Sequence, residues 1–272
     1  NQNSALHINV PLYISHFSKD KKWAFVRASY SFGWVKTSDL ALVSSEFIKT
    51  FKNGNYAMVI KDNLRLYKNK KDVSLIKIGA LFPISKDQRY LIASRDAKGR
   101  AHIEKVSVEK PSIIAKKPLP FTAKNVGMLA NEFYGEPYGW GGSYECRDCS
   151  ATTRDFLGAF GIFLRRNSSK QALDGKKIGI AGLPKSKKKK KIIKDAQPFR
   201  SLLYVPGHIV LYLGEYKGEP VIMHTYWGIR KKDRTKLITA RTIISSTEPG
   251  KELADTREQS KLINTLQTIV NF

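Results

Sequence analysis

Residues 138–160 read YGWGGSYECRDCSATTRDFLGAF, and they place a cysteine where a glycine-rich turn becomes an apolar helix. Cys149 is expected in the first turn of that helix, where unpaired backbone N–H groups and the positive end of the helix dipole favour a thiolate. Gly141 and Gly142 would let a substrate backbone approach the sulfur closely, because glycine has no Cβ atom. The stretch therefore predicts a nucleophilic cysteine.

A cysteine nucleophile needs a base, and the chain has five histidines. His208 follows a Pro-Gly pair and opens an apolar strand, and His224 lies in the next strand of a predicted hairpin. If the hairpin turns about Tyr216, the two histidines are directly opposed on one face, with Cβ atoms about 4.5–5.5 Å apart. One imidazole can then orient the other, as the third member of a catalytic triad orients the base.

Three other interpretations of these residues remain open. Cys146 and Cys149 form a C-x-x-C pair, which is typical of a redox dithiol, although no thioredoxin-like βαβ pattern surrounds it. Together with His208 and His224 they could form a Cys₂His₂ zinc site, although the spacing of the histidines fits such a site poorly. The third alternative is a binding module without catalysis, whose basic surface contacts nucleic acid or wall polymer.

The composition is that of a folded protein with a large excess of basic residues. The 272 residues are enough for two or three domains. Lys and Arg number 48 against 23 Asp and Glu, giving a formal net charge of +25 that attracts polyanions. Part of this excess lies in residues 185–194, KSKKKKKIIK, including the lysine run 187–191, and we expect a solvated loop there. No apolar run is long enough to span a bilayer.

The domain organisation follows from a change of hydrophobic period. Short strands separated by polar turns predict two small β modules, at residues 1–45 and 46–110. Residues 109–120, EKPSIIAKKPLP, are typical of an extended linker. Residues 111–272 are predicted to form an α+β domain. The chain begins Asn-Gln-Asn-Ser without a leader, so we expect a processed product whose export signal is not visible.

Within the predicted α+β domain, apolar spacing indicates three elements besides the cysteine helix. A helix is expected over residues 122–134, because apolar residues recur at helical spacing after a capping threonine. The runs HIVLYLG and PVIMHTYW, separated by EYKGE, predict the hairpin that carries the two histidines. Residues 252–270 place five apolar side chains at helical spacing, so a C-terminal helix is expected there.

At these motifs the chain resembles a known family. The run Y-x-W-G-G, the triplet D-C-S opening a helix, P-G-H-x-x-x-Y-L-G and a histidine in the next strand resemble the NlpC-type cell-wall cysteine peptidases. The motifs S-x-D-x-x-W, YSFGWV and DLA, between residues 18 and 41, resemble the bacterial SH3-like barrels that some members carry in tandem. The resemblance covers residues 10–228. It implies two all-β SH3-like barrels followed by a papain-like α+β catalytic domain.

The resemblance also implies a chemistry and its residues. Cys149, His208 and His224 would form the catalytic triad, and Tyr138 would assist oxyanion binding together with a backbone N–H group. The reaction would pass through an acyl-enzyme, with no metal or cofactor. Members with tandem barrels cleave the bond between γ-D-glutamate and a diamino acid in peptidoglycan stem peptides, outside the cytoplasm. The implied partner is therefore peptidoglycan or its stem peptides rather than nucleic acid, and we expect a monomer.

Some members require a substrate with a free N-terminal L-Ala, and the resemblance implies three residues of this chain that would recognise it. Asp148 and Ser150, which flank the nucleophile, would hold the ammonium group, since a carboxylate pairs well with an ammonium at a fixed distance. Tyr30 from the first barrel would close the other end of the site. The chain departs from the family pattern at Ala151, where glycine is usual, and Cys146 has no place in that pattern.

Overall fold

The computed structural model describes residues 3–68, 71–108, 114–116 and 118–272. Contacts between these residues divide the chain into two compact units. One unit, called the β unit here, comprises Leu6–Asn125 and Ala159–Gly161. The other, called the α+β unit, comprises Val126–Gly158 and Ile162–Phe272 together with the N-terminal residues up to Ala5. No helix in the described part of the chain is both long and apolar enough to cross a membrane.

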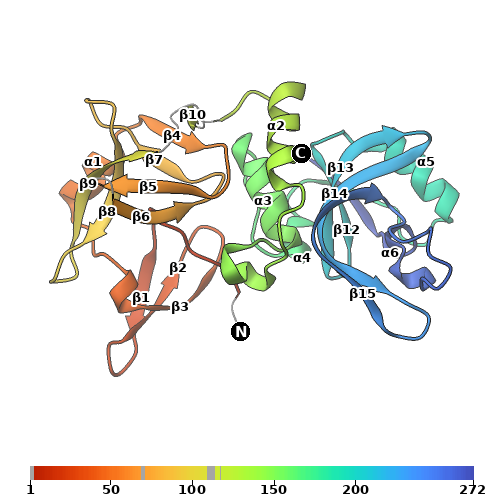
Figure 1. Ribbon diagram of the computed structural model, residues 1–272, viewed down its shortest axis with the longest axis horizontal. Coiled ribbons are helices and arrows are strands. Elements are labelled where there is room, and N and C mark those ends of the chain that lie inside the picture. Colours follow the sequence, from red (N-terminus) through yellow and green to blue (C-terminus); the bar gives the residue numbers. More distant parts are fainter. Residues whose placement is uncertain (1–2, 69–70, 109–113, 117) are drawn as a thin grey trace. The chain divides into compact units, whose positions relative to one another are not determined.

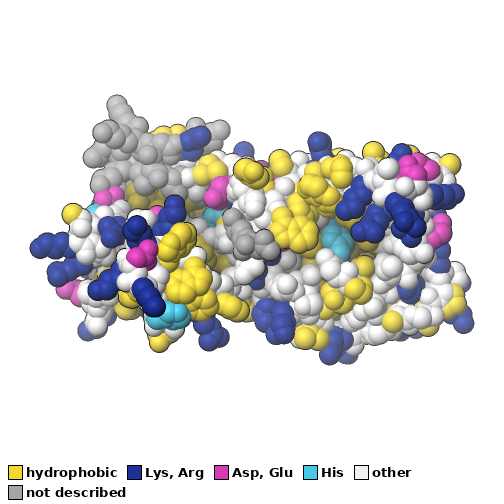
Figure 2. Space-filling model, turned by 90° about the horizontal axis from the view of Figure 1, so that it is seen from below, with side chains coloured by type: hydrophobic (Ala, Val, Ile, Leu, Met, Phe, Trp, Pro, Cys, Tyr) yellow, Lys and Arg dark blue, Asp and Glu magenta, His cyan; other side chains and the backbone are white. Residues whose placement is uncertain are grey.

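The β unit begins with an antiparallel sheet, β1 (Tyr13–Phe17), β2 (Trp23–Arg27) and β3 (Phe32–Lys36), followed by the 3-10 helix η1 (Thr37–Asp39). One face of β2 buries Ala24 and Val26, as the predicted alternation requires. The other face of the sheet exposes aromatic side chains, and Figure 2 shows hydrophobic side chains gathered over this part of the surface. The first predicted β module is therefore strand-rich, as expected.

The rest of the β unit contains the helix α1 (Ser45–Phe51) and two further sheets. Their strands are β4 (Tyr56–Val59), β5 (Leu64–Lys68), β6 (Lys71–Ile76), β7 (Leu81–Pro83), β8 (Tyr90–Arg95), β9 (Ala101–Val108) and β10 (Ile114–Lys116), ordered β10-β4-β7 and β6-β5-β9-β8. β8 and β9 pair with each other as an antiparallel hairpin. The all-β character of the N-terminal region is thus confirmed.

Two predicted boundaries of the N-terminal region look different in the structure. The Asn9 side chain donates to the Leu91 carbonyl over 3.0 Å and accepts from the Ala93 N–H over 3.1 Å. These bonds tie the first predicted module to the second within one compact unit, and a second separate barrel stays a prediction. Of the predicted linker 109–120, residues 114–116 pair with β4, while residues 109–113 and 117 lie outside the described residues.

Helices lead into the α+β unit. They are α2 (Ala123–Phe133), the 3-10 segment η3 (Trp140–Glu145), α3 (Cys149–Ala159) and α4 (Ser168–Gln171). The helix predicted at 122–134 is confirmed, and its apolar stripe of Val126, Leu129, Ala130 and Phe133 is buried. The helix expected to carry the cysteine in its first turn is also confirmed, and it begins at Cys149 itself.

A six-stranded antiparallel sheet forms the centre of the α+β unit. Its order is β11 (Lys176–Gly179), β16 (Thr268–Asn271), β12 (Ser201–Val205), β13 (His208–Tyr216), β14 (Glu219–Arg230) and β15 (Lys236–Ser246). Figure 1 shows α2 and α3 on one side of this sheet and α5 (Lys185–Asp195) and α6 (Leu262–Thr265) on the other. The predicted α+β class of the C-terminal region is confirmed.

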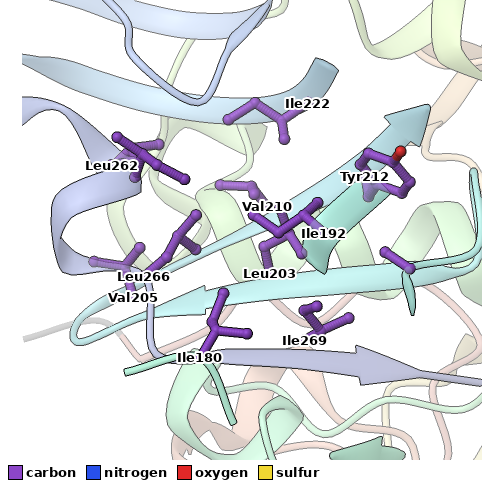
Figure 3. Packing of buried hydrophobic residues seen from close by; sticks show 12 residues of the cluster. Ile180, Ile192, Leu203, Val205, Val210, Tyr212, Ile222, Leu262, Leu266 and Ile269 are labelled. Carbon is purple, nitrogen blue, oxygen red and sulfur yellow. The ribbon is translucent and has the colours of Figure 1, made fainter. Parts of the chain in front are cut away.

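The α5 side of the sheet is closed by a hydrophobic cluster (Figure 3). Ile192 of α5, Leu262 of α6 and Leu266, directly after α6, pack against strand residues such as Val210 and Ile222. The expected C-terminal helix over 252–270 is wrong in its extent, because this stretch is divided into η4 (Glu258–Ser260), α6 and β16. Its apolar residues enter the core from a short helix and a strand.

The prediction of a solvated loop at 185–194 is also wrong, because the lysine-rich stretch forms helix α5. Lys188 is buried, and its ammonium group donates to the carbonyls of Ile263, Asn264 and Leu266 over 2.8–3.1 Å. Lys189 forms ion pairs with Glu219, over 2.7 Å, and with Glu248. The run is therefore a packed helix whose ammonium groups satisfy buried acceptors, with Lys187, Lys190 and Lys194 left on its exposed side.

Candidate active site

The turn before the nucleophile depends on glycine at two positions. Gly142 has φ +86°, and a Cβ atom there would lie 2.7 Å from the backbone nitrogen of Ala5. At Gly139 a Cβ atom would lie 2.4 Å from the Ser143 carbonyl oxygen. Larger residues are therefore excluded from this turn. The predicted space beside Gly142 is taken on one side by the N-terminal segment of the same chain, rather than being left for substrate.

Cys149 is the first residue of α3 and is 8% exposed. Burial raises the pKa of its thiol to about 12, and the negative charge of Asp148 adds to this. The backbone N–H groups of Ile209 and Ser150 and the charge of Arg166 act in the opposite direction. The Ser150 N–H does favour the thiolate, as expected at a helix N-terminus, but desolvation outweighs this effect and the pKa rises overall. The thiol is protonated at neutral pH.

His208 and His224 meet as predicted, although by a different register. The bonded rows of β13 and β14 pair Leu211 with Met223, and a bulge lies between Tyr212 and Gly214. This register places His224 diagonally across from His208 rather than directly opposite. Their imidazoles are nevertheless hydrogen-bonded, with 2.9 Å from His208 Nε2 to His224 Nδ1.

The environment of the two histidines keeps both of them neutral. Burial lowers the pKa of His208 to about 4, while the charge of Asp148 acts to raise it. Burial, and then the neighbouring His208, lowers the pKa of His224 well below its usual value. The His224 ring lies 4.8 Å from the Tyr226 ring, and its Nε2 atom is 3.3 Å from the Ser245 hydroxyl. A neutral His208 is in the protonation state that a general base requires.

Tyr138 belongs to the same electrostatic environment. Burial raises the pKa of its phenol, and negative charge on Cys149, once ionised, and on Asp148 adds to this effect, while Arg166 opposes it. Its ring lies 5.4 Å from the ring of Trp227. The hydroxyl therefore remains protonated near the nucleophile, where it can donate a hydrogen bond.

Asp148 and Ser150, on either side of the nucleophile, are already bonded within the chain. The Asp148 carboxylate caps α3 by accepting from the Ala151 N–H over 2.9 Å, and it also accepts from the Gly141 N–H over 3.2 Å. Arg166 binds both carboxylate oxygens, over 2.9 and 2.6 Å, and donates to the Ser150 hydroxyl over 2.8 Å. A substrate ammonium would therefore meet a carboxylate that is already paired.

Comparisons with known proteins agree with this geometry. A family model described as the NlpC/P60 family matches residues 135–242, and one described as an SH3 domain of the SH3b1 type matches residues 1–36. The first match contains the cysteine turn, α3 and both histidines. The α+β unit carries an NlpC/P60 domain. A comparison with curated proteins gave no match.

Two solved structures resemble nearly the whole chain in fold. A protein described as a novel NlpC/P60 endopeptidase from Photobacterium damselae subsp. piscicida superposes with a TM-score of 0.88 at 25% identity, covering 98% of this chain. This chain covers 64% of that protein. An NlpC/P60 family protein from Bacillus cereus ATCC 10987 has a TM-score of 0.65 at 14% identity, covering 99% of this chain and 82% of its own, which shows a shared fold.

In the NlpC/P60 domain, the Cys146 thiol contacts the turn that precedes α3. It donates to the Tyr144 carbonyl over 3.3 Å, and both cysteines are free. Among the described residues, His, Cys, Asp and Glu side chains form no group of three or more that could hold a metal ion. The geometry therefore gives no support to a zinc site built on Cys146.

Sequence reasoning missed two sets of residues that hold the NlpC/P60 domain around its cysteine. Arg166 lies in the loop after α3, and its sequence neighbourhood, LRRNSS, gives no sign that it reaches back to Asp148. Thr152 of α3 bonds to Thr225, whose hydroxyl lies 2.8 Å from that of Thr242. This buried hydroxyl chain ties the nucleophile helix to β14 beside His224. Tyr30 lies in the β unit, between β2 and β3, and its role at the site stays a prediction.

Proposed function

We propose that the protein is a cysteine peptidase that hydrolyses peptidoglycan stem peptides, at the bond between γ-D-glutamate and a diamino acid. The observation that carries this proposal is the placement of Cys149 at the start of α3, where its sulfur meets the backbone N–H of Ile209, the residue after His208, whose ring is hydrogen-bonded to His224. The membership of this region in the NlpC/P60 family and the likeness to an NlpC/P60 endopeptidase support it. The substrate lies in the cell envelope, so the site of action is extracytoplasmic.

The residues have distinct roles in the proposed reaction. The Cys149 sulfur attacks the amide carbonyl carbon while His208, neutral at rest, accepts the thiol proton. His224 holds the His208 ring through the 2.9 Å bond. The oxyanion accepts hydrogen bonds from the Tyr138 hydroxyl and from the Cys149 N–H, which lies in the first turn of α3, where N–H groups have no intrahelical acceptor. His208 then protonates the leaving amine, and water releases the γ-D-glutamyl group from the thioester.

A binding role for the first β module is the second candidate. The face of β1–β3 that turns away from the buried Ala24 and Val26 carries exposed aromatic side chains, which are Tyr13, Trp23, Phe32 and Trp34 at 41–71% exposure. Exposed aromatic residues on a soluble unit indicate a surface that meets another molecule. Lys and Arg side chains are spread over the visible surface, which suits an acidic wall polymer (Figure 2).

Mass spectrometry of digests tests the peptidase proposal. A synthetic L-Ala-γ-D-Glu-diamino acid peptide should give the dipeptide L-Ala-γ-D-Glu and the free diamino-acid fragment. Trapping with acid during turnover should add the mass of the dipeptide acyl group to the protein at Cys149. Cleavage at another bond would reject the bond assignment while keeping the peptidase. Binding of wall material by Cys149→Ala without cleavage by the unmodified protein would favour the binding role alone.

A further inference from the structure

The strongest unassigned feature near the nucleophile is a buried ion pair. The Asp148 side chain is 14% exposed and the Arg166 side chain 9% exposed, and their contact is bidentate. Arg166 also donates to the hydroxyls of Ser150, over 2.8 Å, and Ser4, over 3.0 Å. All three nitrogen atoms of the guanidinium are therefore bonded within the chain.

Asp148 acts on the thiol in two opposing ways. Its carboxylate caps α3 and so helps to hold Cys149 at the helix start. Its negative charge, however, lies one residue from a sulfur that must become negative during attack. The charge of Asp148 raises the pKa of both Cys149 and Tyr138, and that of Arg166 lowers both. A carboxylate left here without Arg166 would be an uncompensated buried charge beside the reacting sulfur.

We propose that Arg166 is a positioning residue for the nucleophile: it pairs with and orients the Asp148 carboxylate, so that Asp148 can cap α3 while opposing formation of the thiolate at Cys149 less than an unpaired carboxylate would. This inference rests on the proposed function of Cys149 as nucleophile. It assigns Arg166 an electrostatic task that a purely structural ion pair would not have. The titratable or charged groups around Cys149 are Asp148, Arg166, Tyr138, His208 and His224.

The sign of the effect separates the two roles. If the ion pair is only structural, loss of either partner disturbs the position of Cys149 and lowers the rate at which its thiol reacts. If Arg166 compensates for the charge of Asp148, removing Arg166 should lower the reaction rate of the Cys149 thiol. Asp148→Asn should raise that rate, because asparagine still caps the helix and carries no charge.

Alkylation of Cys149 by iodoacetamide measures this effect without any substrate. The experiment uses the full chain carrying Cys146→Ser, so that Cys149 is the single thiol, with Arg166→Gln, Arg166→Lys, Asp148→Asn and the double variant Arg166→Gln/Asp148→Asn. At neutral pH we expect Arg166→Gln to react about tenfold more slowly, which corresponds to one pKa unit. Arg166→Lys, which keeps the charge but loses the bidentate geometry, should lie between Arg166→Gln and the parent chain.

Two results decide the proposal. The double variant should react at least as fast as the parent chain, and Asp148→Asn should react faster than it. The proposal is overturned if Arg166→Gln reacts at the parent rate, or if the double variant stays as slow as Arg166→Gln. Should Arg166→Gln fail to fold by circular dichroism, slower alkylation of a folded Asp148→Asn chain overturns it as well. Because alkylation needs no peptide, loss of the proposed substrate assignment would leave these results unchanged.

Discussion

The two halves of the site are held in different ways. The nucleophile sits in a dense ionic network at the start of α3, where Asp148 accepts from Arg166 and from backbone N–H groups. The base sits on β13 and β14, where His208 is held by the His224 ring, and His224 by Ser245 and the Tyr226 ring. Both halves reach the same electrical state, a neutral thiol opposite a neutral imidazole.

A cysteine site can hold its charges at rest, as a thiolate and an imidazolium, or it can develop them only during the attack. Burial acts on both halves, and it opposes charge on sulfur and imidazole alike. Charge therefore has to develop during the attack, when the proton moves from Cys149 to His208. On the nucleophile side, Arg166 offsets part of the cost that the Asp148 charge adds to the new negative charge, whereas the histidine side supplies orientation.

The largest expected effect comes from removing the nucleophile. Cys149→Ala should lower the hydrolysis rate of an L-Ala-γ-D-Glu-diamino acid peptide by several orders of magnitude, because the acyl-enzyme can no longer form. Cys146→Ala should keep nearly full activity, since its thiol bonds only to the Tyr144 carbonyl among the described contacts. Rates measured by chromatography of the products check both variants. Equal inactivity of the two would show that the cysteines act together.

The position of the nucleophile could be predicted from the sequence, because the residues that indicate it are neighbours along the chain. A glycine-rich turn that leads into an apolar helix predicts Cys149 in the first turn of that helix, and α3 begins at Cys149. The resting protonation state could not be predicted in this way, since it depends on burial by segments distant in sequence. Arg166 escaped notice for the same reason, as 18 residues separate it from Asp148 and no periodicity links them.

The contact between the two histidines was predicted from cross-strand pairing in a hairpin, and the error in that prediction concerns the register. The hairpin and the meeting of the two rings are confirmed, but the register is shifted, because the strands turn between Tyr216 and Glu219 rather than about Tyr216, and only one residue of that shift is taken back by the bulge at Tyr212/Gly214. Hydrophobic patterns do not reveal such a bulge. The lysine helix α5 was missed because its stability comes from buried carbonyls and from Glu219 and Glu248, which lie far along the chain.

Removing the base tests the other half of the comparison. His208→Ala should lower kcat by about a thousandfold, because a general base contributes roughly 10²–10⁴ in rate. His224→Gln should lose only about ten- to a hundredfold, as its amide can still hold the imidazole of His208. Stopped assays of kcat for the two variants give the ratio. If His224→Gln is the more damaging change, the roles of the two histidines are reversed.

The pH dependence of the thiol tests the neutral resting pair directly. With a pKa of about 12 for Cys149, the thiolate fraction rises about tenfold for each pH unit below that value. Iodoacetamide alkylation of the Cys146→Ser chain should therefore climb without a plateau from about pH 6 to 9. A thiolate–imidazolium pair would instead react at a nearly constant rate across this range. A plateau below about pH 8 would show that the two halves exchange the proton before substrate arrives.

The smallest expected effect concerns the N-terminus of the substrate. Asp148 and Ser150 are predicted to hold the ammonium of a free L-Ala, but Arg166 already binds both of them. Because Asp148 is not left unpaired when the ammonium is absent, a free-amine stem peptide should be cut less than about tenfold faster than its N-acetylated form. Arg166→Gln should enlarge that preference, since the ammonium would then be the only cation for Asp148. Comparison of kcat/KM for the two peptides in both chains measures it. A preference well above a hundredfold in the unmodified chain would mean that the ammonium displaces Arg166, so that Asp148 serves the substrate before it serves the nucleophile.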